Sequence, residues 1–329
     1  MTRSPFPLPP ELGARFTTKA ATDLGVSGSR LRGADLEHPF YGTYRRRDHG
    51  GSNNLARPHS RYELWRHRQL ELAATLMQRL PSDTFFSGRT AAAIWDIPTP
   101  ITSDGTLEVV RFSPGRALRL DGVRCTRIDP KYVRVTHHNG FPVTDAASTW
   151  CMLAPRLSWK DGIALGDGAI HRPRFPGTQR LIRKPHSTLE QMKLLATMPR
   201  RRGRNLLAEM TSWLSTQSAS APESQLRLTL AEWHLPDPQL DYDVRDSAGR
   251  LLGCSEIAWP EFRLAQEYEG DHHRTDTAQW NRDLQKYRDY RKAGWEVVRV
   301  TADLLYRRPG QLRSDTVELL VKQGWLQSK

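Results

Sequence analysis

The alternation of apolar and polar positions is clearest near the C-terminal end of the chain, between residues 262 and 268. Phe262, Leu264 and Tyr268 occupy every second or fourth position and are separated by other residue types. This two-residue period predicts a β-strand with one buried face, because side chains alternate across the pleat of a strand.

Two carboxylates lie on the other face of that predicted strand. Glu267 and Glu269 are two residues apart, so they point to the same side. Gly270 ends the strand, and an imidazole pair, His272 and His273, follows soon after. Carboxylates repel one another at this spacing unless a cation neutralises them, and carboxylate oxygens are ligands that suit Mg²⁺ or Mn²⁺.

Helices and strands are expected on both sides of this segment. Ser220 precedes Glu223 by the spacing of a capping box, which marks the start of a helix. The expected elements are a helix from residue 220, a hairpin over 240–257, a strand over 262–268, a helix over 276–293 and a strand over 295–301. This order predicts an α/β core in which helices pack against a mixed sheet.

A different pattern near the N-terminus predicts a helix-turn-helix. Thr17 and Ser27 can cap the first and second helices, Gly25 can end the first helix, and Leu31 faces inward. The spacing of these residues is that of a helix-turn-helix, and the segment 40–47 would supply a strand of the wing. An ordinary helical hairpin with the same cap chemistry is the alternative.

Positive charge is concentrated in a few clusters along the chain. The net charge is +13, and the clusters lie at 44–48, 171–175, 180–186 and 200–204. Such clusters favour nucleic acid over a merely solvated surface, and the absence of a basic amphipathic helix with a long apolar face disfavours a membrane. We expect DNA as the partner, contacted through Arg30, Arg32, Arg45, Arg46 and Arg47.

Changes in composition along the 329 residues predict three domains. A polar, glycine-containing stretch ends near residue 60, and a Ser/Ala/Pro-rich break spans 216–224. The intervening part contains strand-like runs at 107–112 and 123–128. We expect an α+β or α/β multi-domain fold with a winged-helix module over 1–60, a middle α+β domain over 61–215 and a last domain over 216–329.

Several classes of protein are disfavoured by composition. The chain has no run of eighteen apolar residues, and its N-terminus lacks the apolar region of a secretory signal. Its three cysteines are far apart, so neither a disulfide framework nor a thiolate zinc site is expected. These features predict a cytoplasmic protein that does not bind membranes.

The C-terminal residues resemble the PD-(D/E)XK nuclease superfamily, and within it the very-short-patch-repair (Vsr-like) endonuclease branch. The resemblance covers about residues 218–306 and rests on the segments PESQLR, SEIAWPEFRLAQEYEGDHHR and RDLQKYRDYRKAGWEVVRVTADLL. It implies a restriction-endonuclease-like core with the element order α-β-β-β-α-β. Residues 10–170 more loosely resemble the winged-helix and second domains of abortive-infection, type IV antitoxin-like proteins, through FTTKAATDLGVS, PFYGTYR, FFSGRTAAAIWDIP and GFPVTDAASTWCMLA.

The nuclease resemblance implies a metal site. Glu256 and Glu267 would hold Mg²⁺ or Mn²⁺, and Glu223 would join them from the preceding helix. The ion would polarise the scissile phosphate and lower the pKa of an attacking water. A helix cap is the alternative role for Glu223, and a solvent-exposed edge strand is the alternative for Glu267 and Glu269.

The remaining catalytic assignments also come from the resemblance. Glu269 stands where the superfamily often has lysine, and His272 or His273 would act as a base or stabilise the leaving group. The family pattern has Asp in place of Glu256 and, in this branch, usually Asp in place of Glu269. Each Glu is longer by about 1.5 Å of bond length. A displacement of roughly 1 Å can cost on the order of 10²-fold in rate.

Three functions are compatible with these observations. The first is a divalent-metal-dependent DNA endonuclease with its own DNA-binding module, and the retained carboxylates favour it. The second is a non-catalytic, antitoxin-like DNA-binding regulator with a degenerate nuclease fold. The third is a scaffold that binds a protein partner, for which the positive charge is incidental.

Overall fold

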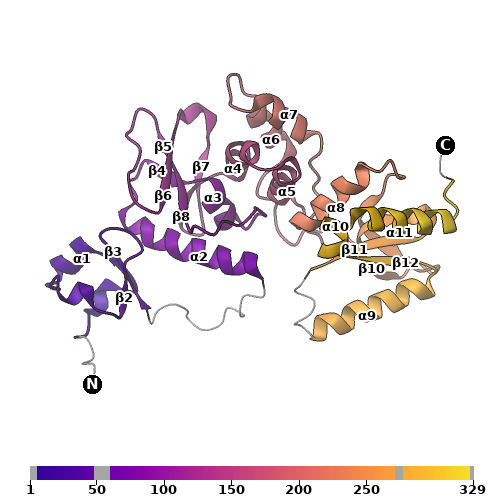
Figure 1. Ribbon diagram of the computed structural model, residues 1–329, viewed down its shortest axis with the longest axis horizontal. Helices are drawn as coiled ribbons and strands as arrows, with labels where there is room; N and C mark the ends of the chain where they lie inside the picture. The colour runs from indigo at the N-terminus through magenta and orange to yellow at the C-terminus, as the bar shows by residue number, and fades with distance from the viewer. Residues whose placement is uncertain (1–5, 48–59, 271–276, 327–329) are drawn as a thin grey trace. The chain divides into compact units, whose positions relative to one another are not determined.

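The computed structural model describes residues 6–47, 60–270 and 277–326 and shows a mixed α+β, multi-domain chain (Figure 1). It divides into two compact units, Met1–Leu153 and Ala154–Lys329. The coarse fold class expected from the sequence is therefore confirmed, whereas the domain limits at residues 60 and 215 stay predictions. No helix in the described part of the chain is long and apolar enough to cross a membrane.

The first unit begins with a small antiparallel sheet in the order β1-β3-β2. Its strands are β1 (Arg15–Thr17), β2 (Leu36–Glu37) and β3 (Thr43–Arg46). Helix α1, Thr18–Asp23, begins at the predicted cap, where the Thr17 hydroxyl accepts a hydrogen bond from the Ala20 N–H at 3.1 Å. Phe16 and Leu31 belong to the buried apolar cluster of this part of the chain.

The second helix of the expected helix-turn-helix is absent from this described region. Gly25 has the left-handed φ of 75° that the pattern predicts. Arg30–Arg32, however, forms a single 3-10 turn that Gly33 ends. Glycines at 28 and 33 bracket the segment and disfavour a longer helix. The turn is too short to act as a recognition helix in a major groove, so the prediction of a second helix is wrong.

A five-stranded mixed sheet forms the rest of the first unit, in the order β6-β5-β4-β8-β7. Its strands are β4 (Thr84–Phe86), β5 (Leu107–Phe112), β6 (Val123–Ile128), β7 (Val135–His138) and β8 (Phe141–Thr144). The helices are α2 (Arg61–Leu76), α3 (Gly88–Trp95) and α4 (Ala146–Leu153). The three consecutive alanines of α3 are fully buried, and small side chains of this kind allow neighbouring elements to approach closely.

The second unit contains a four-stranded sheet in the order β12-β11-β10-β9. Its strands are β9 (Gln239–Arg245), β10 (Leu251–Trp259), β11 (Leu264–Glu269) and β12 (Glu296–Thr301). The helices are α5 (Trp159–Ile170), α6 (Leu189–Ala196), α7 (Arg204–Thr211), α8 (Ala221–Ala231), α9 (Thr277–Lys292), α10 (Ala302–Tyr306) and α11 (Pro309–Lys322). Strands β9, β10 and β11 are antiparallel, and β12 is parallel to β11 after the crossover through α9.

Helices cover both faces of this sheet (Figure 1). One buried cluster joins Leu226 of α8 and Leu312 of α11 to Leu264 of β11. The other cluster joins Tyr290 of α9 to Ala265, the next residue of β11. Strand β11 is therefore buried on both faces at its start, which corrects the expectation of a half-buried strand.

The start of β11 also differs from the sequence prediction. Pro260–Phe262 forms a 3-10 turn, and Arg263 has a left-handed φ of 46°. The strand therefore begins at Leu264 and not at residue 262. Phe262 nevertheless packs against the same apolar cluster as Leu264, so the apolar pattern correctly identified the buried side.

A buried carboxylate fixes helix α8 against helix α5. Asp167 is fully buried, and its Oδ2 accepts hydrogen bonds from the Ser224 hydroxyl at 2.7 Å and from Arg227 at 2.9 Å. Its Oδ1 accepts from the Ser215 N–H at 2.7 Å. Burial raises the pKa of Asp167, while these donors act in the opposite direction. The network fixes the position of α8, the helix that carries Glu223, against α5.

The left-handed backbone at Gly25 provides a test of the N-terminal turn. Gly25→Val forces a β-branched residue into φ of 75°, whereas Gly28 lies outside that region and both positions have open space around an added Cβ. We expect Gly25→Val to lower the free energy of unfolding by roughly 1–2 kcal/mol and the control Gly28→Val to change it much less. Urea unfolding of the two variants measures this, and equal losses would contradict the assignment of the turn.

Candidate functional site

Strands β10 and β11 separate at the acidic residues. Their register runs from Trp259 opposite Leu264 to Ile257 opposite Gln266. Beyond that point, the Tyr268 N–H donates to the Glu256 carboxylate, with 2.7 Å between N and Oε2. A side chain thus takes the place of a strand-to-strand backbone bond. We call this separation, which carries Glu256 and Glu267, the acidic notch.

Glu267 is the most enclosed acid of the notch, with 6% of the residue exposed. Its Oε1 accepts a hydrogen bond from the Ser255 hydroxyl at 2.8 Å and forms an ion pair with Lys286 Nζ, also at 2.8 Å. The same ammonium group donates to the Cys254 carbonyl oxygen at 2.7 Å. Helix α9 therefore supplies a cation to the notch.

Lys286 was missed by the sequence interpretation. The pattern placed a carboxylate, Glu269, at the position where a lysine is common, and no cation was assigned in its place. Lys286 lies one helical turn before Tyr290, whose hydroxyl is 3.4 Å from the Ser255 hydroxyl. An i, i+4 pair of this kind shares one helix face, so the apolar Tyr290 could have indicated that Lys286 also faces the sheet.

Glu223 reaches the notch from the first turn of α8. Its backbone N–H donates to the Ser220 hydroxyl at 3.4 Å, and its Oε2 accepts from the Ala219 N–H at 2.8 Å. The side chain therefore serves as a helix cap, the alternative role considered from the sequence. Burial raises the pKa of this carboxyl, and the charges of Glu267 and Asp241 raise it further.

The three acids lie within electrostatic reach of one another. The pKa of Glu256 is raised to about 9, first by burial and then by the negative charges of Glu223 and Glu267. The Tyr268 N–H and Lys286 act in the opposite direction but do not cancel these effects. The positive charge of Lys286 is therefore too small to let Glu223, Glu256 and Glu267 all be ionised at the same time.

Other predicted site residues are not brought into this group by the structure. Glu269 forms an ion pair with Arg299 of β12, and the Arg299 guanidinium lies over the Tyr287 ring at 5.6 Å from its centroid. His272 and His273 lie outside the described residues. The described part of the chain contains no group of three or more His, Cys, Asp or Glu side chains arranged to hold a metal ion.

Two of the arginines expected to contact DNA are engaged in ion pairs. Arg30 binds Asp35 through both ends of its guanidinium group, at 2.9 and 2.6 Å. Arg45 contacts Glu37 and also lies 3.4 Å from Glu71. The contacts of Arg45 connect β3 to β2 and α2, and the acidic partners neutralise the charge of both arginines.

The other three arginines differ in exposure. Arg46 donates to the Pro9 carbonyl oxygen at 3.0 Å and is partly buried. Arg32 and Arg47 are exposed. Of the five predicted contacts, Arg32 and Arg47 are thus the side chains whose positions suit an external anion.

Comparison with known proteins finds similar chains in mycobacteria. The uncharacterized proteins MT2308 and Rv2248 of Mycobacterium tuberculosis, from strains CDC 1551 and H37Rv, are each 28% identical over 246 residues, 72% of this chain and 84% of theirs. No family model matches the chain, and no solved structure matches it. The names of these relatives assign no activity, so the geometry of the notch has to carry any functional conclusion.

The raised pKa of Glu256 predicts a pH dependence of stability. The pKa is above its ordinary 4.5, at about 9, so the folded chain retains a proton there that the unfolded chain releases. The resulting contribution to stability is complete below the unfolded pKa and is lost as the pH rises towards the folded pKa, by up to about 1.4 kcal/mol per pH unit.

We expect urea unfolding in EDTA, between about pH 5 and about pH 9, to show this loss in the wild type and a smaller loss in Glu256→Gln. The exposed Glu318 gives a control, Glu318→Gln, that should follow the wild type. Identical slopes in all three proteins would contradict the assignment.

Proposed function

We propose that the second unit is a divalent-metal-dependent DNA endonuclease that hydrolyses phosphodiester bonds. The observation that carries this proposal is that Glu223, Glu256 and Glu267 lie within electrostatic reach of one another at the acidic notch, where the pKa of Glu223 and that of Glu256 are raised. Buried acids that lack compensating charge favour a bound cation, and perturbed acids of this kind concentrate at functional sites.

The donor set fits a hard divalent cation in its chemistry. All three side chains offer carboxylate oxygens, which Mg²⁺ and Mn²⁺ prefer. Among the described residues, no three His, Cys, Asp or Glu side chains are already close enough together to hold a metal ion. Lys286 Nζ lies 2.8 Å from Glu267 Oε1 and provides positive charge there, so its ammonium group competes electrostatically with a cation bound by the same carboxylate.

The topology around the notch supports the same proposal. The elements α8, β9, β10, β11, α9 and β12 follow the α-β-β-β-α-β order that the nuclease resemblance implies. The acids lie on the two central strands, β10 and β11, and on the helix that precedes the sheet. A restriction-endonuclease-like core is the finer fold that we propose for residues 216–329.

Each residue of the notch then has a distinct task. Glu256 and Glu267 would hold the cation, with Glu223 contributing from α8. When bound, Mg²⁺ or Mn²⁺ supplies charge to polarise the scissile phosphate and to activate a water. Ser255 orients the Glu267 carboxylate through its 2.8 Å hydrogen bond. Lys286 supplies a positive charge from α9, a role for which Glu269 is unsuited because it is a carboxylate paired with Arg299.

A non-catalytic DNA-binding regulator is the second candidate. The ion pair between Lys286 and Glu267 favours it, because a protein side chain already neutralises the acid that a catalytic cation would need. Glu256 and Glu269 stand where the nuclease family that this chain resembles has aspartate. This difference agrees with a non-catalytic function. The two candidates differ in whether the notch binds a divalent cation and cleaves DNA.

The decisive experiment is cleavage of supercoiled plasmid by the purified full-length chain with Mg²⁺, Mn²⁺ or EDTA. We expect nicking or linearisation that requires the cation. Glu267→Gln should reduce the rate on the order of 10²-fold or more because it removes a ligand charge. The exposed-site variant Glu318→Gln should cleave like the wild type. Metal-independent cleavage, or equal cleavage by Glu267→Gln, would rule out a reaction at the notch.

Removal of Lys286 tests whether its ammonium group competes with a cation. Lys286→Met leaves the Glu267 charge without its partner, so the free energy of unfolding in EDTA should fall by roughly 3 kcal/mol. The gain in melting temperature on adding Mn²⁺ should exceed that of the wild type, since binding to the folded state stabilises by mass action.

Lys292→Met is the matched control for that measurement. Lys292 lies on the same helix with 78% of its side chain exposed. It should behave like the wild type with and without Mn²⁺. A Mn²⁺-dependent gain in Lys286→Met no larger than that of the wild type would favour the regulator.

A further inference from the structure

Residues 172–184 form a basic hairpin that packs against the sheet of the second unit. The Phe175 N–H donates to the Arg180 carbonyl oxygen at 3.0 Å, and the Ile182 N–H donates to the Pro173 carbonyl oxygen at 2.8 Å. Gly177 turns the chain with a left-handed φ of 76°. We call this segment the basic hairpin, and it is separate from the arginines considered near the N-terminus.

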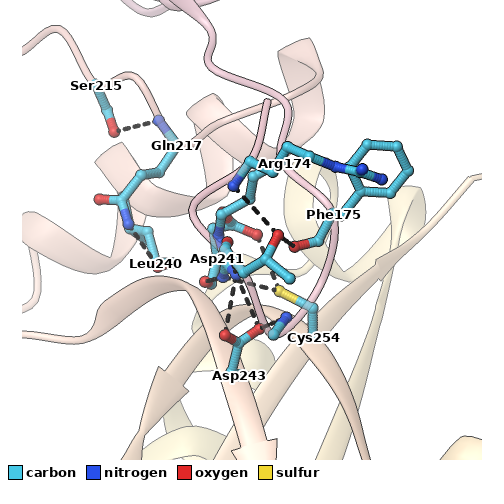
Figure 2. Close-up of polar contacts among 11 residues, drawn as sticks. Arg174, Phe175, Ser215, Gln217, Leu240, Asp241, Asp243 and Cys254 are labelled. Carbon is cyan, nitrogen blue, oxygen red and sulfur yellow. Dashed lines mark hydrogen bonds and ion pairs between the residues drawn. The ribbon is translucent and has the colours of Figure 1, made fainter. Parts of the chain in front are cut away.

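One arginine anchors the basic hairpin to the sheet. Figure 2 shows Arg174 pointing towards Asp241 and Asp243 of β9 and towards Cys254 of β10. Its Nε lies 2.5 Å from Asp241 Oδ2, and its Nη1 lies 2.9 Å from Asp243 Oδ1. Only 13% of the Arg174 side chain is exposed. The two aspartates neutralise Arg174, so this residue fixes the hairpin and is not available for a ligand.

The backbone adds to this anchor. The Gly177 N–H donates to Asp243 Oδ1 at 2.9 Å. A Cβ on Gly177 would lie 2.9 Å from Leu251 Cδ2, so the turn is in close contact with the start of β10. At the base of the hairpin, the Arg172 N–H donates to the Thr216 carbonyl oxygen at 2.9 Å. The hairpin is thus held at its tip, its middle and its base.

The other cations of the hairpin are presented to solvent. Residues 171–187 contain no Asp or Glu. Arg172, Arg180, Arg183 and Lys184 are exposed, and none of them has a carboxylate partner among the described residues. Ordered, exposed cations without acidic partners form the electrostatic footprint of a phosphate-binding surface.

An aromatic ring gives part of this surface a defined shape. The Arg180 guanidinium lies over the Phe175 ring, 4.3 Å from its centroid. Phe175 is 40% exposed although it is a large apolar residue. Stacking restricts the guanidinium and lowers the entropy lost when it binds a phosphate.

Arg174, which anchors the basic hairpin, contacts the same segment of β10 that contributes to the acidic notch. Arg174 Nη2 lies 3.5 Å from Cys254 Sγ, and the Cys254 carbonyl oxygen accepts a hydrogen bond from Lys286. The next residue, Ser255, donates to Glu267. The charge of Asp241, the partner of Arg174, contributes to the raised pKa of Glu223. The basic hairpin is therefore fixed beside the notch by direct contacts within one unit.

We propose that the basic hairpin is the element of the second unit that binds duplex DNA, through contacts of Arg180, Arg183 and Lys184 with the phosphate backbone. It holds DNA next to the acidic notch without reading base sequence. This inference rests on the proposed function in taking DNA as the ligand, but it does not depend on a metal or on cleavage.

The test measures binding of a short fluorescent DNA duplex to the full-length chain in EDTA, over a range of salt concentrations. A triple variant, R180Q/R183Q/K184Q, removes three hairpin charges. The control R291Q/R307Q/R313Q removes three exposed charges of the same unit, from α9, the end of α10 and α11. All six side chains are exposed, and circular dichroism and melting temperature verify that both variants fold.

We expect the hairpin triple to weaken binding about tenfold or more and to lower the slope of log K against log salt by up to about 2.7, or 0.9 for each phosphate contact. The control should change both quantities much less. Equal losses in the two variants would show that bulk charge attracts the DNA and would overturn the inference. The absence of salt-dependent binding by the wild type would overturn it as well.

The plasmid assay separates this inference from the proposed function. Specific loss of binding in the hairpin triple together with a wild type that never cleaves supports the basic hairpin and contradicts the endonuclease. Metal-dependent cleavage with unchanged binding by the hairpin triple supports the endonuclease and overturns the role of the hairpin.

Discussion

The ion pair between Glu267 and Lys286 is the interaction on which the arrangement of the second unit depends. Burying a carboxylate costs several kcal/mol unless a partner compensates for the lost hydration. Lys286 provides that partner and also binds the Cys254 carbonyl oxygen, so a single ammonium group connects α9 to both β10 and β11. In a continuous sheet the Tyr268 N–H would donate to a backbone carbonyl oxygen of the neighbouring strand. Here it donates to the Glu256 carboxylate instead, which keeps β10 and β11 apart at this point.

Local features of the chain were predictable from the sequence, whereas contacts between elements were not. The cap at Thr17 and the order of elements from α8 to β12 follow from turn residues and from hydrophobic periodicity, which act over a few residues. The approach of Lys286 to the sheet depends on how α9 packs, and the pairing of Glu269 with Arg299 depends on strand register. Neither packing nor register can be read from spacing along a single chain.

Net charge likewise describes the whole chain and not the availability of individual cations. Arg30 and Arg45 fall in the segment that composition marks as DNA-binding, yet acidic neighbours neutralise both. Arg174 belongs to a cluster of the same appearance and acts as an anchor, while Arg180, on the other strand of the same hairpin, stacks on an exposed ring. Structural and ligand-binding arginines can therefore alternate within one basic segment, and only their partners distinguish them.

The buried Asp167 has a practical consequence for dissecting the chain into fragments. A fragment that starts at the composition break near residue 216 would contain Ser224 and Arg227 but would lack the carboxylate that both of them bind. It would also expose the side of α8 that packs against α5. An expression fragment that begins before Trp159 keeps this network whole, so the smallest piece suited to crystallisation or isotope labelling is longer than the segment that resembles a nuclease.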